Sequence, residues 1–137
     1  MPTPSVVIVT GASPRIGLSA AEHLLARGHT VYGAARRVEK MAPIEAKGGT
    51  MLALDVTDND SMTAAVEAVL EAGGRIDALV HNAGYGSYGA VEDVDLEEGR
   101  RQFDVDVFGL ARLAVASRWL LPDRVFDAFL RSRMGLS

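Results

Sequence analysis

Residues 10–17 read "TGASPRIG" and directly follow an apolar run, Val6–Val9. A short apolar run that ends in glycine is typical of a strand covered on both faces. Gly11 and Gly17 then bracket a strand-to-helix turn, where the first glycine permits the tight turn and the last permits close helix–strand packing. Because backbone N–H groups at the start of such a helix face an anion, the stretch predicts a phosphate-binding turn. Two glycines in such a turn are also compatible with a purely structural role.

The alternation of strand and helix continues through the first 84 residues. Strands are predicted at residues 6–10, 30–35, 50–56 and 78–81. Apolar residues recur at helical spacing at 16–25 and 62–70, and a weaker helical stretch at 38–47 is interrupted by Pro43. Strands that alternate with amphipathic helices imply right-handed crossovers. The predicted fold class is therefore α/β, a doubly wound parallel sheet truncated to about four strands in the order 3-2-1-4, with helices on both faces.

The character of the sequence changes after Gly84. A loop rich in glycine and tyrosine leads to "DLEE" at 95–98, which resembles a capping box at the start of a helix that continues to Ala114. The tail, 121–137, is predicted to form one more helix. Since no strand candidate follows His81, we expect a single truncated domain over residues 1–137, with an α/β half at 1–113 and a helical tail at 114–137.

The composition excludes several classes of protein. The chain has 137 residues, a formal net charge of −4 and no cysteine. An acidic chain without a lysine or arginine cluster argues against nucleic-acid binding, and the lack of cysteine excludes disulfides and thiolate metal sites. No pair of carboxylates or histidines has metal-ligand spacing. The apolar runs are far shorter than the roughly 20 residues of a membrane span, and the N-terminus lacks a signal-peptide pattern, so we expect a cytoplasmic protein without a membrane partner.

Further candidate binding residues follow the later strands, because open α/β sheets bind ligands at the carboxyl ends of their strands. The second strand ends where NAD-selective proteins carry an acid, yet Arg36 follows here. Its guanidinium suits a 2′-phosphate, although a solvated basic loop is the alternative. Asp55 and Val56 follow the third strand, and residues 82–84 follow the fourth. Asp55 could instead cap the next helix, and Asn82 could be a turn residue.

Together the motifs "TGASxxIG", "LDVTD", "RIDALVHNAG" and "FDVDVFGLARL" resemble, in order and spacing, those of the short-chain dehydrogenase/reductase family over roughly residues 4–113. The resemblance implies a Rossmann-type fold that binds NAD(P)(H), with hydride transfer between a nicotinamide and an alcohol or carbonyl. It also implies roles by position: Gly11, Ser13, Ile16 and Gly17 line the pyrophosphate, Arg36 favours NADP(H), Asp55 and Val56 meet the adenine, Asn82, Ala83 and Gly84 meet the adjacent ribose and phosphate, and Asp77 is a structural aspartate.

The glycine-rich turn departs from the family's pattern. Arg15 stands at the family's middle glycine, whose missing side chain lets the backbone approach the pyrophosphate. Pro14 removes one N–H donor and pushes Ser13 out of the helical region. Arg15 is itself a candidate cofactor-binding residue, because its charge can pair with phosphate. We nevertheless expect NADP(H) binding to be weakened or lost, since a side chain intrudes here.

The family's catalytic residues have no counterpart in this sequence. Its chemistry needs a serine that orients the carbonyl, a tyrosine that delivers the proton and a lysine four residues after that tyrosine, yet no YxxxK occurs. Asp106 replaces the family's catalytic asparagine and is expected to be an exposed helix aspartate. His81 is the histidine with a position near the expected cofactor, and we expect it to satisfy backbone groups rather than act as an acid. No catalytic residue is predicted.

Near Leu113–Ser117 the chain passes directly to a segment that resembles the family's C-terminal helix, which we interpret as an internal deletion. The fourth strand then becomes a sheet edge and the last helices lose partners. We therefore expect a homo-oligomer formed through the strand-four edge or the C-terminal helices. Three functions stay open: a cofactor-binding relative without its own catalytic residues, a non-enzymatic self-associating module, and an active oxidoreductase completed by another chain.

Overall fold

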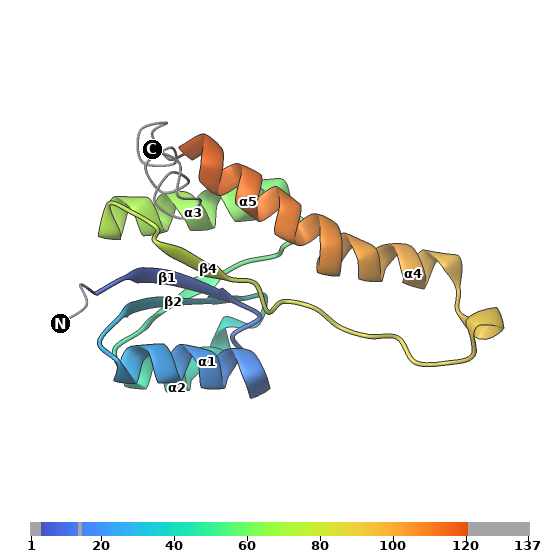
Figure 1. The fold of residues 1–137 in the computed structure, drawn as a ribbon, viewed down its shortest axis with the longest axis horizontal. Coiled ribbons are helices and arrows are strands. Elements are labelled where there is room, and N and C mark those ends of the chain that lie inside the picture. The colour runs from blue at the N-terminus through green and yellow to red at the C-terminus, as the bar shows by residue number, and fades with distance from the viewer. Residues whose placement is uncertain (1–3, 14, 121–137) are drawn as a thin grey trace, which may run out of the picture.

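A computed structural model describes residues 4–13 and 15–120 and contains a four-stranded parallel sheet (Figure 1). The strands are β1 (Val6–Thr10), β2 (Thr30–Ala35), β3 (Thr50–Ala53) and β4 (Ala78–Val80). Their order is β3-β2-β1-β4, which confirms the predicted order. In this register Val9 of β1 lies opposite Gly33 of β2 and Val80 of β4.

Helices cover both faces of the sheet, as predicted. In Figure 1, α1 (Arg15–Ala26) and α2 (Ala42–Ala46) lie on one face, and α3 (Asn59–Gly73) and α5 (Gly109–Leu120) lie on the other. Alternate residues of a strand point to opposite faces, so β1 contributes to two cores. Val7 and Val9 pack with the core under α1 and α2, whereas Val6 and Ile8 pack with the core that contains Met62, Val66 and Leu113.

Helix ends follow local side-chain chemistry. The Asp58 carboxylate accepts hydrogen bonds from the N–H groups of Asp60 and Ser61 and so caps the start of α3. Gly74, with φ of +69°, ends the helix in the left-handed conformation that favours glycine. The predicted interruption at Pro43 is wrong. Pro43 stands in the first turn of α2, directly after a 3₁₀ turn at Val38–Met41, and no intrahelical N–H bond is required there.

Two strands are shorter than predicted. β3 ends at Ala53 rather than Val56. The Leu54 N–H still donates to the Ala35 carbonyl of β2 at 3.1 Å, but the following Asp55 N–H donates to the Ser61 hydroxyl at 3.0 Å. β4 ends at Val80 rather than His81. Among the described residues β4 pairs with β1 alone. The Asp77 carboxylate ties the two together, since it accepts the Val6 N–H at 2.7 Å.

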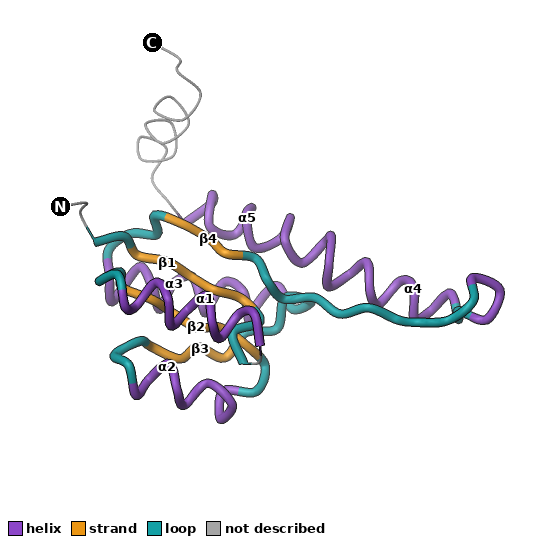
Figure 2. Tube along the Cα trace, turned by 60° about the horizontal axis from the view of Figure 1, so that its bottom comes forward, coloured by secondary structure: helices purple, strands orange, loops and turns teal. Residues whose placement is uncertain are grey.

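After β4 the chain runs outward from the sheet and returns along one long helical run (Figure 2). This run consists of α4 (Leu96–Phe103), a π-helical turn (Asp104–Phe108) and α5. The Asp95 carboxylate accepts the Glu97 N–H and caps α4, in line with the predicted helix start. Helix α5 packs on α3, while Figure 1 shows α4 extending beyond the sheet. The predicted tail helix at 121–137 lies outside the described residues.

Candidate cofactor site

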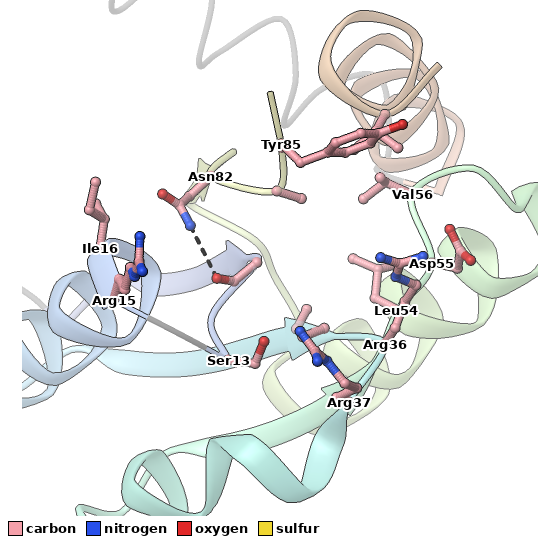
Figure 3. Close-up of a pocket in the computed structure, with 16 residues that line it drawn as sticks. Ser13, Arg15, Ile16, Arg36, Arg37, Leu54, Asp55, Val56, Asn82 and Tyr85 are labelled. Atoms are coloured by element: carbon pink, nitrogen blue, oxygen red, sulfur yellow. Dashed lines mark hydrogen bonds between the residues drawn. The ribbon is translucent and has the colours of Figure 1, made fainter. Parts of the chain in front are cut away.

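A pocket of about 370 Å³ lies at the carboxyl ends of β1, β2 and β4 (Figure 3). The structure brings to it all but one of the residues predicted to bind a cofactor: Gly11, Ser13, Arg15, Ile16, Arg36, Asp55, Val56, Asn82, Ala83 and Gly84. The exception is Gly17. Their contact with a cofactor stays a prediction.

Gly17 acts behind the pocket rather than in its lining. A Cβ atom on Gly17 would lie 2.3 Å from the carbonyl oxygen of Gly11 and 2.5 Å from the Asn82 amide nitrogen. These are far below contact distance, so the turn closes against Asn82 only with glycine here. The Asn82 side chain in turn donates to the Gly11 carbonyl at 3.1 Å. Gly17 therefore positions the turn through packing.

The backbone of the turn keeps a glycine-like shape at two positions. Gly11 has φ of +64°, and a Cβ there would lie 2.8 Å from the Ala83 Cα. Arg15 has φ of 49° and is the non-glycine residue with positive φ in the described part of the chain. An L-residue in this region costs about 1 kcal/mol. The Arg15 side chain is exposed and lines the pocket. The strain of the positive φ therefore lies in the backbone of the turn, and the side chain extends into the site.

A buried hydroxyl joins the end of β1 to the loop after β4. The Thr10 hydroxyl is fully buried and accepts the N–H groups of Asn82 and Ala83, each at 3.1 Å. With its acceptor positions used, the hydroxyl donates its proton to Nδ1 of His81, 3.3 Å away. This arrangement matches the neutral tautomer of His81 that carries its proton on Nε2. It supports the loop through Thr10 rather than through a backbone group.

The surroundings of His81 favour the neutral form. Burial lowers the pKa of His81, and the charge of Asp106 offsets part of that effect. The Nε2 atom is buried, and no described residue accepts a hydrogen bond from it. A neutral imidazole with one nitrogen committed to Thr10 is a positioning group.

At the end of β2, Arg36 lies beside Asp55 (Figure 3). The Asp55 carboxylate accepts the Thr57 N–H at 2.9 Å and the Thr57 hydroxyl at 2.7 Å. Burial raises the pKa of Asp55. The two bonds from Thr57 and the charge of Arg36 together lower it by more, so the pKa of Asp55 lies below its usual value. Asp55 does not cap α3, because Asp58 holds that position.

The expectation of an exposed Asp106 is wrong. Asp106 is half-buried in the π-helical turn, and its Oδ1 accepts the Tyr85 N–H at 3.1 Å. A Cβ on Gly84 would lie 2.9 Å from the same oxygen. The wider π turn adds one residue and turns this side chain toward the loop after β4. An amide oxygen could accept the same bond, so this contact does not require the charge of the carboxylate.

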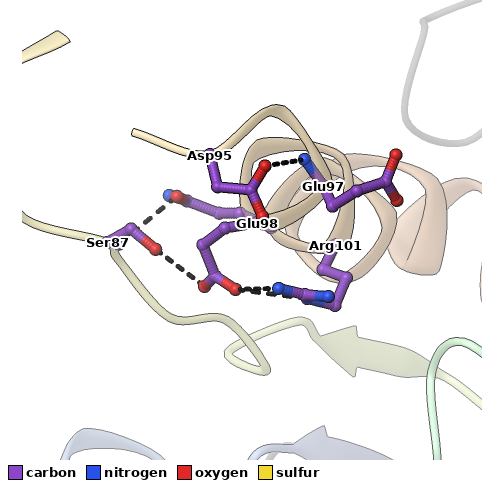
Figure 4. A network of polar contacts seen from close by, with 6 residues as sticks. Ser87, Asp95, Glu97, Glu98 and Arg101 are labelled. Atoms are coloured by element: carbon purple, nitrogen blue, oxygen red, sulfur yellow. Dashed lines mark hydrogen bonds and ion pairs between the residues drawn. The ribbon is translucent and has the colours of Figure 1, made fainter. Parts of the chain in front are cut away.

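The loop after β4 is also held from α4 (Figure 4). The Ser87 hydroxyl donates to Glu98 at 2.8 Å, the Ser87 N–H donates to Gln102 at 3.3 Å, and Arg101 pairs with Glu98 at 2.8 Å. Partial burial and the neighbouring Glu98 raise the pKa of Tyr85. A phenol with a raised pKa is a weaker proton donor.

Sequence reasoning missed several lining residues: Ala34, Ala35, Arg37, Leu54, Tyr85 and Val105. Arg37 was detectable as a second arginine beside Arg36, whereas Val105 comes from the helical run and needed the tertiary structure. The described residues contain no group of His, Asp or Glu side chains suited to a metal ion. None of the helices in the described part of the chain has the length and apolarity to cross a membrane.

Comparison with known proteins agrees with this geometry. A family model for the short chain dehydrogenases matches residues 5–122. The chain is 38% identical over 114 residues to the 3-ketodihydrosphingosine reductase of Bacteroides thetaiotaomicron, a match that covers 82% of this chain and 40% of that enzyme. The chain therefore spans about two fifths of the length of this curated relative.

Solved structures show the same fold. A short-chain dehydrogenase from Streptomyces avermitilis matches with a TM-score of 0.81 and 36% identity, over 96% of this chain and 46% of that one. An alcohol dehydrogenase from the archaeon Thermococcus sibiricus, complexed with 5-hydroxy-NADP, matches with a TM-score of 0.77 and 30% identity, over 84% of this chain and 52% of that one.

Proposed function

Because the chain belongs to the short-chain dehydrogenase family, we propose that its pocket binds NADP(H) as the cofactor-binding part of an oxidoreductase for alcohol or carbonyl groups. The observation that carries the choice of NADP(H) is the position of Arg36. It directly follows Ala35, the strand-end position at which an NAD-selective site would carry an acid, and it lines the pocket. Its planar, positively charged guanidinium can pair with a 2′-phosphate, whereas a carboxylate at this place would repel that group.

The turn after β1 fits a dinucleotide. A Cβ at Gly11 or Gly17 would collide with backbone atoms or Asn82, so both glycines allow close packing around the turn. Arg15 and Ile16, the first residues of α1, line the pocket, where a helix start suits a pyrophosphate. Thr10 and Asn82 hold the neighbouring loop in place. When bound, NADP(H) supplies or accepts a hydride.

We propose that the chain by itself binds the cofactor without turnover. Its sequence contains no tyrosine followed four residues later by lysine, and the raised pKa of Tyr85 disfavours proton donation at the pocket. Activity would then require a second polypeptide that supplies the proton donor. Turnover of an alcohol or carbonyl by the purified chain would overturn this part of the proposal.

A fluorescence titration with NADPH and NADH tests the cofactor assignment. We expect saturable binding, with NADPH preferred, and we expect Arg36→Gln to weaken NADPH binding about 10-fold while NADH binding is unchanged, because one charge-assisted contact is worth about 1.4 kcal/mol. Arg27→Gln, an arginine outside the pocket lining, is the matched control. Absence of saturable binding at millimolar NADPH would contradict the proposal.

We also propose that the chain self-associates, as a cytoplasmic protein, through the helical run at 96–120. Leu96, Phe103, Phe108 and Val115 are all exposed on it, by 74%, 61%, 53% and 53%. Leu96 and Val115 lie equally far along the sequence from a point between Val105 and Asp106, and so do Phe103 and Phe108. An antiparallel pair of copies related by a two-fold axis would therefore set apolar residues opposite each other at both places.

Sedimentation velocity tests self-association. We expect a dimer for the parent chain and a monomer for Phe103→Ser, because burying a large apolar side chain is worth about 2 kcal/mol in each copy. Tyr88→Ser is the control, since Tyr88 is 98% exposed on the loop and lies outside this face. A dimer that persists in Phe103→Ser would point instead to the open edge of β4.

A further inference from the structure

We propose that Arg15 is a ligand of the cofactor's pyrophosphate, an inference that rests on the proposed NADP(H) site. The family resemblance alone makes Arg15 an obstacle, because it replaces a glycine that lets phosphate approach the backbone. The geometry points the other way. With φ of 49°, Arg15 adopts the backbone conformation that a glycine would adopt, and α1 begins at this residue. The turn therefore keeps its shape and gains a cation.

The charge of Arg15 has no partner within the described part of the chain. Arginines away from the pocket mostly pair with carboxylates: Arg75, Arg100, Arg101 and Arg112 each form an ion pair. None of the three arginines that line the pocket forms an ion pair with a described residue. Asp55 lies beside Arg36 in the same lining, so the pocket gathers three arginines and one carboxylate in a protein with a net charge of −4.

The pocket arginines stand at different ends of the site. Figure 3 shows Arg15 on the side of Ile16 and Asn82, at the turn after β1, whereas Arg36 lies beside Asp55 and Leu54, after β2. In a dinucleotide site the pyrophosphate lies at the start of the helix after β1, and the 2′ position of the adenosine ribose lies at the end of β2. Arg15 is thus placed for the pyrophosphate and Arg36 for the 2′-phosphate.

A charge at this point compensates for what the turn has lost. Pro14 has no N–H to offer to a phosphate. A guanidinium presents several N–H donors in a fixed fork and pairs strongly with phosphate oxygens. One flexible side chain can therefore replace a missing backbone donor, provided that the backbone can still follow a glycine-like path at that residue. The positive φ of Arg15 meets this condition.

Three ligands separate the two arginines. NADPH carries both phosphate groups, ADP-ribose carries the pyrophosphate without a 2′-phosphate, and adenosine 2′-monophosphate carries the 2′-phosphate without a pyrophosphate. We expect Arg15→Gln to weaken NADPH and ADP-ribose about 10-fold and to leave adenosine 2′-monophosphate unchanged. We expect Arg36→Gln to weaken NADPH and adenosine 2′-monophosphate and to leave ADP-ribose unchanged.

Arg15→Gly distinguishes a ligand from an obstacle. Glycine relieves the positive φ, so we expect a higher melting temperature together with ADP-ribose binding as weak as that of Arg15→Gln. Calorimetric titration and thermal unfolding of the same samples give both readouts. Equal or tighter ADP-ribose binding by either Arg15 variant would overturn the inference while leaving the NADP(H) site intact. A parent chain that binds none of the three ligands would overturn both proposals.

Discussion

The sheet and the α4 helix differ in how their apolar side chains are covered. Val9 of β1 is fully buried, whereas Leu96 and Phe103 of α4 are 74% and 61% exposed. β1 lies between two helical layers, but α4 extends past the sheet, where the described residues offer it no second layer (Figure 1). The pocket end of the molecule is therefore stabilised by its own core, whereas the described contacts of the α4 end are mostly local bonds.

Charges follow the same division. On α4, Glu97 pairs with Arg100 and Glu98 pairs with Arg101, each three residues apart along one helix. Such exposed pairs contribute only about 0.5 kcal/mol each. At the pocket none of the three arginines forms an ion pair with a described residue, although Asp55 lies beside Arg36. Ion pairs within the helix thus distinguish α4 from the pocket lining.

The largest effect is expected where the helical run joins the core. Leu113 of α5 is 1% exposed and packs with Met62 and Val66 of α3. Leu113→Ala should lower the free energy of unfolding by about 3 kcal/mol, since it removes buried methyl groups and leaves a cavity. Leu96→Ala, in the exposed part of the run, should change it by less than about 0.5 kcal/mol. Urea unfolding at low protein concentration measures both, and equal losses would remove the distinction between the two regions.

The next effect concerns the pocket turn. Gly17→Ala should cost about 2 kcal/mol and abolish NADPH binding, because the new methyl group would collide with the Gly11 carbonyl and the Asn82 amide. Gly28→Ala is the matched control. Gly28 has φ of +83°, but a methyl group there would meet no atom within 4 Å, so that variant should lose about 1 kcal/mol and bind normally. Unchanged NADPH affinity in Gly17→Ala would refute the packing role.

A smaller effect should appear with pH. The pKa of His81 in the folded protein is lowered by burial, so the unfolded chain binds more protons as the pH falls below about 6.5. The contribution of His81 to the free energy of unfolding is therefore fully present above that pH, and it decreases as the pH falls toward the pKa of His81 in the folded protein. Protonation also removes the Nδ1 acceptor that Thr10 uses. Chemical unfolding at pH 7.5 and 5.5 should show a smaller difference for His81→Asn than for the parent, and identical differences would exclude His81 as the cause.

The smallest effect is expected at Gly99 of α4, where a methyl group would meet nothing within 4 Å. Gly99→Ala should raise the free energy of unfolding by about 0.5 kcal/mol, because alanine favours the helix. Gly74→Ala has equal space but starts from φ of +69°, so it should be destabilising. Thermal unfolding should thus show a higher melting temperature for Gly99→Ala and a lower one for Gly74→Ala than for the parent. An increase in both variants would show that the positive φ does not matter at Gly74.

Strand bounds illustrate how far the sequence alone could go. The bounds of β1 and β2 were predicted to the residue, because continuous apolar runs buried on both faces leave few alternatives. The end of β3 was placed too late. Leu54 and Val56 are buried like strand residues, and the Leu54 N–H still donates to the Ala35 carbonyl of β2, but the chain then turns toward α3, where the Ser61 hydroxyl accepts the Asp55 N–H. A side-chain bond across a turn is invisible to an apolar pattern.

The candidate site divides in the same way. Glycine spacing and strand ends predicted most residues that line the pocket, since the carboxyl ends of parallel strands meet at one edge. Asp106 was assigned to solvent because helical spacing assumes a regular helix, and the π-helical turn changes which way that side chain points.

By itself, the sequence determined the α/β class, the strand order and the family, because short apolar runs, turn glycines and motif spacing are local properties of the chain. Only the tertiary structure decided that Gly17 acts by packing, that His81 meets the Thr10 hydroxyl, and that Arg15 has a positive φ at the start of α1. Each of these depends on atoms from distant segments meeting within a few ångströms, and on a backbone angle that no residue pattern encodes.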